Sequence, residues 1–212
     1  MYIGPLEREN YMISERIVGY LTVLPIFLVS LTVHEYAHGW VAYKCGDDTA
    51  KKLGRLTLNP LAHITLFGTI IMPLIMHFGW AKPVPVNFAV LTKKDIFKVA
   101  AAGPATNILL AVTLAAAFHL FALESQPAIA NFVLLAILIN LILAIFNLLP
   151  IPPLDGSKMV YACLKSPTAI KAYMHYARFG MIIFIVFIVV FDGFRLILPV
   201  VGAVYTLLRL PF

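Results

Sequence analysis

The feature that most constrains this chain is an apolar run that ends in a cluster of ionisable side chains. Residues 17–33 carry no charge, and His34, Glu35 and His38 follow within the same segment. An ionisable group inside a membrane-spanning helix costs roughly 2.5 to 3.5 kcal/mol on insertion scales. Three such groups within five positions therefore indicate a site with a function.

The spacing of these residues suits a metal. At about 100° per residue, His34 and His38 lie one turn apart on one helix face, where two neutral imidazoles can bind one Zn²⁺. Glu35 flanks that face and can reach a water beside the metal, as a general base must. The alternative is a pair of hydrogen-bonded core histidines, because the HExxH pattern also occurs by chance in soluble proteins. The apolar surroundings favour the metal site.

The composition indicates a polytopic membrane protein. Of the 212 residues, 61% are apolar and 12% are charged, and the mean hydropathy is +0.92, which is outside the range of soluble domains. Basic loops beside apolar spans account for the net charge of +6, so we expect no nucleic-acid partner. Cys45 and Cys163 lack CxxC spacing and are interpreted as ordinary thiols.

The apolar segments predict an all-α polytopic membrane protein with about five transmembrane helices, a re-entrant or interfacial apolar segment, and a short β-like loop region. The predicted spans are about 17–43, 96–123, 128–149, 179–191 and 194–208. Glycine and proline break the ambiguous segment, 61–80. The β-like pattern is that of Leu53, Leu56 and Leu58. Residues 1–16 are expected to be a polar lead-in that could turn along the interface, without a secretory cleavage signal.

Asp155 is the best candidate for a third ligand. A catalytic zinc site usually has three protein ligands and an open position. Asp155 is the only carboxylate around the apolar stretch 128–149, and the adjacent prolines and glycine bend the backbone there. A plain turn at a helix end is the alternative. Because two histidines alone do not complete a zinc site, we favour Asp155 as a ligand over a plain turn.

This ligand set constrains the topology. If 61–80 crossed the membrane, Asp155 and the histidines would face opposite sides, so we expect that it does not cross. The 16 Lys and Arg residues then divide 13 to 3 in favour of the side with the site, as the positive-inside rule requires. A crossing segment would give 11 to 5 with the opposite orientation, which also obeys the rule. The metal geometry therefore places the site towards the cytoplasm.

Three linked motifs follow one another along the chain. They are His34-Glu35-Tyr36-Ala37-His38, Gly103-Pro104-Ala105-Thr106-Asn107, and Asn147 eight positions before Asp155 in Pro-Pro-Leu-Asp-Gly. Together they resemble the site-2 protease family of intramembrane zinc metalloproteases. The stretches 59–63 and 79–87 are similar to its small branch, which has no PDZ or CBS module.

The resemblance implies a zinc-dependent endopeptidase that hydrolyses a peptide bond in transmembrane segments of membrane protein substrates, as in regulated intramembrane proteolysis. The implied catalytic set is Glu35 as base, Asn147 to stabilise the oxyanion or hold the substrate carbonyl, and His34, His38 and Asp155 as ligands of one Zn²⁺ per chain. Gly103, Pro104 and Asn107 would support the site. His63 would be a supporting residue or a further metal contact, and an ordinary surface histidine explains it equally well.

The resemblance also sets the expected organisation and partners. We expect one integral membrane metalloprotease domain over 1–212, with a catalytic core at about 17–156 and C-terminal helices at about 176–210. Its partners would be a transmembrane protein substrate and the lipid bilayer, and a homo-oligomer is left open. The expected location is the prokaryotic cell (inner) membrane.

A substrate-binding segment is suggested by Pro83, Val84, Pro85, Val86 and Asn87. This alternating stretch cannot form a regular helix, so it could pair with an extended substrate by strand addition. A rigid surface loop is equally consistent with it.

Two competing functions use the same cluster. One is a membrane metal transporter or metal-binding protein, and the other is an inactive scaffold that binds transmembrane helices. Transport needs repeated sites along a path, whereas this chain has one compact cluster with a base. Glu35→Gln separates the protease from the transporter, because a protease keeps its zinc and loses turnover, whereas a transporter could keep its flux.

Overall fold

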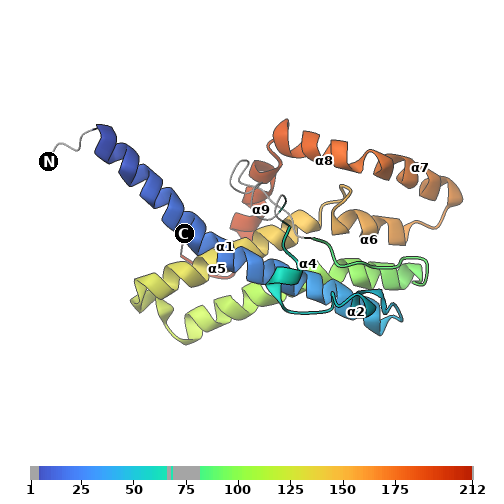
Figure 1. The fold of residues 1–212 in the computed structure, drawn as a ribbon, viewed down its shortest axis with the longest axis horizontal. Coiled ribbons are helices and arrows are strands. Elements are labelled where there is room, and N and C mark those ends of the chain that lie inside the picture. Colours follow the sequence, from blue (N-terminus) through green and yellow to red (C-terminus); the bar gives the residue numbers. More distant parts are fainter. Residues whose placement is uncertain (1–4, 66–67, 69–81, 212) are drawn as a thin grey trace.

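The computed structural model describes residues 5–65, 68 and 82–211, and throughout these ranges the regular secondary structure is helical (Figure 1). The all-α expectation is therefore confirmed for the described residues. The expected β-like pattern after the first span is wrong. Thr49–Lys52 form one helical turn, and Gly54 turns the chain with a φ of +64°, so Leu53, Leu56 and Leu58 do not share an extended strand.

The elements keep the order of the predicted segments. They are α1 (Pro5–Lys44), α2 (Thr49–Lys52), η1 (Pro60–Ala62), α4 (Lys93–Leu120), η3 (Leu123–Ser125), α5 (Pro127–Asn147), α6 (Asp155–Cys163), α7 (Pro167–Arg178), α8 (Gly180–Val189) and α9 (Gly193–Leu207). The ambiguous apolar segment 61–80 lies mostly outside the described residues. Helix α1 begins at Pro5, a favoured first residue of helices, so most of the expected polar lead-in continues the first helix instead of turning along the interface.

Three helices of the described part are long and apolar enough to cross a membrane. They are the Gly19–Lys44 part of α1, and the whole of α4 and α5. The bent pair α7 and α8, at 60° to each other, would make a fourth span if counted as one. The expectation of about five spans is not confirmed. The ten residues of α8 and fifteen of α9 reach only about 15 and 22 Å at 1.5 Å per residue, short of a hydrocarbon core of ~30 Å.

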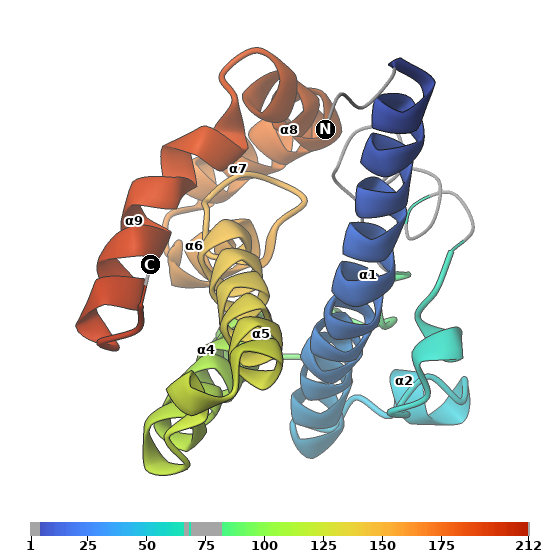
Figure 2. The same ribbon diagram turned by 90° about the vertical axis from the view of Figure 1, so that its left-hand side faces the viewer.

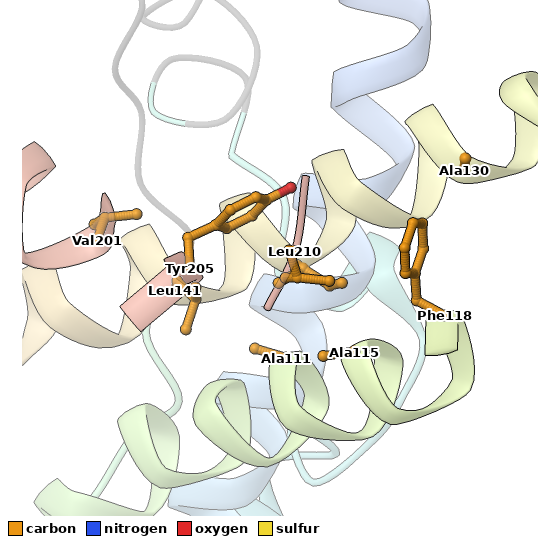
Figure 3. Close-up of a cluster of buried hydrophobic side chains, with 9 residues drawn as sticks. Ala111, Ala115, Phe118, Ala130, Leu141, Val201, Tyr205 and Leu210 are labelled. Carbon is orange, nitrogen blue, oxygen red and sulfur yellow. The ribbon is translucent and has the colours of Figure 1, made fainter. Parts of the chain in front are cut away.

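The core of the molecule forms where α4 and α5 meet each other and the C-terminal helix. Figure 2 shows α1, α5 and α9 side by side in that order. Ala111 and Ala115 of α4 give the small surface that lets helix backbones approach closely, and Leu141 of α5 and Tyr205 of α9 pack there (Figure 3). This core fixes α4 and α5 as a pair against which α1 packs.

The end of α5 sets the position of the site. The chain leaves α5 after Asn147, and its prolines prevent a continuous helix before α6 starts at Asp155. Gly156 packs directly on the carbonyl groups of Leu148 and Leu149, where a Cβ atom would collide. The proline-broken link therefore folds α6 back closely, with Asp155 in its first turn.

Candidate active site

Two histidines and an aspartate from distant parts of the chain meet inside the protein. His34 and His38 lie on α1 with their Nε2 atoms 3.0 Å apart. The Asp155 Oδ2 atom lies 3.2 Å from His34 Nε2 and 3.0 Å from His38 Nε2. All three side chains are buried. Among the described residues, this is the group of three ionisable side chains that could hold a metal ion.

The polar atoms of the three candidate ligands that point away from the ligand group also have partners. The His38 Nδ1 atom lies 2.6 Å from the carbonyl oxygen of Val99, and His34 Nδ1 lies 2.5 Å from Asn107 Oδ1. A carbonyl oxygen only accepts, so each imidazole donates from Nδ1 and keeps the Nε2 lone pair for a metal. Lys158 pairs with Asp155 Oδ1 at 2.8 Å, which leaves Oδ2 facing the histidines.

The donor set and its spacing fit a zinc ion. Two imidazole nitrogens and one carboxylate oxygen are ordinary zinc ligands, and on a tetrahedron their separations would be about 3.3 to 3.5 Å. The observed separations of 3.0 to 3.2 Å are close to this. Gly103 of α4 faces the same point. A Cβ atom there would lie 2.5 Å from His34 Nε2 and closer to His38 Nε2, so only glycine leaves room for an ion.

Glu35 lies beside the histidines but outside the ligand group. Its side chain is half-buried, and Oε2 accepts a hydrogen bond of 2.8 Å from the backbone N–H of Val84. Glu35 lines the same cavity as the three candidate ligands. Its carboxylate is therefore placed to act on a molecule in the cavity.

The cavity has a volume of about 690 Å³, and most of its lining residues are apolar. Its walls come from α1, α4, α5, α6, α8, the segment before α4 and the link between α5 and α6. Asn147 is part of the wall, and its Nδ2 atom donates to the carbonyl of Leu143 at 2.9 Å. Mostly apolar walls with a few convergent polar groups are typical of a ligand-binding or active site.

Three of the five predicted substrate-binding residues line this cavity. They are Pro83, Val84 and Val86, whereas Pro85 and Asn87 lie outside the lining. Val84 is buried against Gly39 of α1, where a Cβ atom would lie 3.0 Å from the valine Cγ1. The segment therefore sits directly over the helix that carries Glu35.

Two side chains from the loop after α1 hold the ends of this segment. Arg55 Nη2 donates to the carbonyl oxygen of Lys82 at 2.9 Å, and Asp47 Oδ2 accepts from the backbone N–H of Asn87 at 2.7 Å. Burial alone would raise the pKa of Asp47, but hydrogen bonds from Thr49 and Asn87 outweigh it and hold the pKa below its ordinary value. Asp47 is thus an ionised anchor.

The remaining predicted residues divide into two groups. Gly103, Pro104 and Asn107 are buried in α4, and two of them touch the histidines. His63 is buried away from the ligand group, with its Nε2 atom 2.9 Å from the carbonyl of Thr57. Its own carbonyl accepts from Lys82 N at 2.9 Å, so the structure places it at the base of the 82–87 segment.

Sequence reasoning missed several residues of this region: Ser30, Asp47, Arg55, Asn140 and Lys158. Two of them carried a readable signal. Asn140 is a lone amide near the middle of an apolar helix, and polar groups at such positions need a partner. Lys158 stands three residues after Asp155, within reach on a helix.

Fold and site together define a membrane protein with a buried His-His-Asp group, adjacent to a glutamate, at one end of its spanning helices. The family model described as peptidase family M50 matches residues 22–124 and 122–191. The chain therefore belongs to this family, the site-2 protease family.

The relatives carry matching names. "Putative zinc metalloprotease YwhC" of Bacillus subtilis is 42% identical over 186 residues, which cover 83% of this chain and 84% of that protein. "Putative zinc metalloprotease Rip2" of Mycolicibacterium smegmatis is 27% identical over 80% of this chain and 67% of its own length. "Putative zinc metalloprotease Rip3" of Mycobacterium tuberculosis is 33% identical over 77% of this chain and 36% of its own length. No solved structure matches the chain.

Proposed function

We propose that this chain is a zinc-dependent intramembrane endopeptidase, which hydrolyses a peptide bond in transmembrane segments of membrane protein substrates. One observation carries the proposal. Two imidazoles and a carboxylate lie 3.0 to 3.2 Å from one another, beside a second carboxylate, in an apolar cavity between membrane helices. Membership of a peptidase family supports it.

His34, His38 and Asp155 would hold one Zn²⁺ per chain, and Gly103 leaves the space for it. When bound, Zn²⁺ supplies Lewis-acid chemistry, since it polarises a carbonyl and lowers the pKa of a water. The Nδ1 contacts of both histidines keep their Nε2 lone pairs turned inward. These lone pairs are what a metal ligand requires.

Glu35 would take the proton from the attacking water and pass it to the leaving amine. The hydrogen bond from Val84 N–H orients its carboxylate on the cavity wall. Asn147 would stabilise the oxyanion. Its amide has two N–H groups, and one of them is used by the carbonyl of Leu143. The other can donate to the developing negative charge.

The substrate would bind as a locally extended peptide, because a helix protects its own peptide bonds. The apolar cavity walls suit the side chains of a transmembrane segment. Residues 83–87 would pair with it by strand addition. Val84 N–H already donates to Glu35, so the pairing would use Val86 and the carbonyl groups of the segment.

We further propose that the protein is one integral membrane domain in a prokaryotic cell membrane, with its site towards the cytoplasm. The meeting of His34 and Asp155 requires the C-terminal ends of α1 and α5 to lie on the same side. The basic loops then also lie there, as the positive-inside rule requires.

Cys163, at the exposed end of α6, should resist a membrane-impermeant maleimide applied to intact cells and react after lysis. Labelling of intact cells at Cys163 would contradict this orientation.

The test of the function is Glu35→Gln in the purified protein. We expect cleavage of a model transmembrane substrate to fall by about 10² to 10⁴-fold, the usual worth of a general base, while one zinc per chain is retained. Glu124→Gln is the matched control, because it makes the same change at an exposed position in η3, at the far end of α4. Undiminished cleavage in Glu35→Gln would overturn the proposal. Zinc uptake into vesicles with no cleavage by the wild type would favour the transporter.

A further inference from the structure

A buried chain of amides leads from His34 to the centre of α5. Asn107 Oδ1 lies 2.5 Å from His34 Nδ1, and Asn107 Nδ2 donates to Asn140 Oδ1 at 2.8 Å. Asn140 Nδ2 donates in turn to Ser30 Oγ at 2.9 Å and to the carbonyl oxygen of Ala136 at 2.9 Å. The two amides and Ser30 are at most 3% exposed. These hydrogen bonds connect α1, α4 and α5 directly behind the candidate metal centre.

The donor-to-acceptor direction of these hydrogen bonds is fixed at the Asn140 end. The carbonyl oxygen of Ala136 can only accept a hydrogen bond, so the Asn140 amide must turn its nitrogen towards it. Its Oδ1 atom then faces Asn107 and requires a donor there. The carbonyl oxygen of Ser30, 3.3 Å from Asn107 Nδ2, makes the same demand on the second amide.

The orientation of the two amides also determines the tautomer of His34. With both amide nitrogens turned away, Asn107 Oδ1 is the atom that faces His34 Nδ1. An oxygen acceptor at this position requires the proton of the neutral imidazole to be on Nδ1. The Nε2 atom is then left with its lone pair, facing His38 and Asp155.

We propose that Asn140 is a positioning residue, which acts through Asn107 to hold His34 in the tautomer and orientation that bind the metal. The proposal rests on the proposed zinc site and deepens it. His38 offers the contrast within the same site. Its Nδ1 donates directly to the backbone carbonyl of Val99, so one ligand is oriented by the main chain and the other by a relay of two side chains.

A purely structural role for Asn140 is the alternative, because an amide buried without partners in an apolar helix is costly wherever it lies. The two roles differ in how substitutions combine. If Asn140 acts through Asn107, removing it matters only while Asn107 is present. Independent structural contributions would add.

The experiment measures zinc affinity by competition with a chromophoric chelator, for the full-length protein in detergent. Outer-shell partners of metal ligands typically contribute 10- to 100-fold in affinity, so we expect Asn140→Leu to weaken zinc binding by about 10-fold and Asn107→Leu by up to about 100-fold. The double variant should bind zinc as Asn107→Leu does. An additive double variant, or an unchanged affinity in Asn140→Leu, would overturn the proposal.

Two further variants keep the result interpretable. Leu141→Ala changes a buried neighbour on α5 outside the relay, so it should lower thermal stability and leave zinc affinity unchanged. If Asn140→Leu does not fold, Ser30→Ala removes only a hydroxyl acceptor of Asn140. It should then weaken zinc binding about 2- to 3-fold, which is less than for a direct outer-shell partner because Ser30 acts through both amides, and it should have no effect in the Asn107→Leu background.

The outcome also separates this inference from the proposed function. A wild-type protein that binds zinc and cleaves, together with relay variants of unchanged affinity, removes the relay alone. A wild-type protein without zinc removes both. Loss of affinity in the relay variants with no peptidase activity in any form removes the function and keeps the relay.

Discussion

The two sides of the candidate active site are built differently. On the inner side, His34 is backed by a buried relay of amides from α4 and α5, and His38 by a main-chain carbonyl. On the outer side, the segment 82–87 is held by Arg55, Glu35 and Asp47, which bond only to its backbone. The inner side fixes individual atoms, whereas the outer side fixes the course of a chain.

This difference matches the two tasks of the proposed enzyme. A metal requires donor atoms within a few tenths of an ångström, and rigid helices with satisfied polar partners give that precision. A peptide substrate must enter and leave, so the side that meets it uses a short extended segment beside the cavity. Changes on the inner side should therefore affect zinc, and changes on the outer side should affect cleavage alone.

The largest effect is expected on the inner side, from Gly103→Ala. The added methyl group would lie at the point where the two Nε2 atoms meet, so we expect no bound zinc and no cleavage, measured by metal analysis and a substrate assay. Gly19→Ala is the control, because a Cβ atom there meets nothing within 4 Å. One zinc per chain in Gly103→Ala would contradict the assigned metal position.

The outer side should respond most to Val86→Pro. Proline removes a backbone donor from an extended segment, so cleavage should fall by at least about 10-fold with the zinc content unchanged, if strand addition holds the substrate. Val84→Pro would also lose cleavage, but it removes the hydrogen bond to Glu35 as well, so Val86 is the cleaner position. Full activity in Val86→Pro would show that the segment is only a surface loop.

A smaller effect on the inner side is expected from Lys158→Met. Lys158 holds the second oxygen of Asp155 at 2.8 Å, and its loss should weaken zinc binding by about 10-fold, as for other outer-shell partners. Lys165→Met, at an exposed position after α6, is the matched control. Equal zinc affinities in the two variants would mean that the ion pair does not orient the ligand.

The smallest effect concerns Asp47 and pH. Because its pKa is lowered in the folded protein, its stabilising bonds are present above the unfolded pKa and are lost as the pH falls through the folded one. We expect the wild type to lose cleavage in acid, because the 82–87 segment loosens when Asp47 is protonated. The bound zinc is measured separately at each pH. Asp47→Asn should cleave a few-fold more slowly at neutral pH, since the hydrogen bonds it keeps lack the charge. Identical pH profiles for the two proteins would show that the charge of Asp47 does not hold the 82–87 segment.

The sequence predicted the parts of the site that depend on local spacing. His34 and His38 share a helix face because they are four residues apart, and the prolines before Asp155 bend the chain wherever it lies in the fold. The long apolar segments likewise predicted α4 and α5 to within a few residues. In these cases the information lies within one turn or one helix.

The parts that were missed depend on contacts between distant segments. Ser30 and Asn140 are 110 positions apart, and only the rotation of α1 against α5 brings them together. The C-terminal helices α8 and α9 were counted as spans from their hydropathy, but the turn at Asp192, with a φ of +48°, and the bend before α8 leave each helix too short to cross alone. Apolar composition therefore indicated the membrane environment, whereas the predicted number of crossings is not confirmed by the described helices.

The proposed intramembrane cleavage is tested most directly by mapping the peptide bond that the purified protein cleaves. A model substrate with one transmembrane segment would be incubated in lipid vesicles with the wild type and with Glu35→Gln, and both products would be identified by mass spectrometry. We predict a cut inside the membrane-embedded residues by the wild type, and no cut by Glu35→Gln with its zinc retained. Cleavage confined to the soluble flanks, or an unchanged cut by Glu35→Gln, would contradict it.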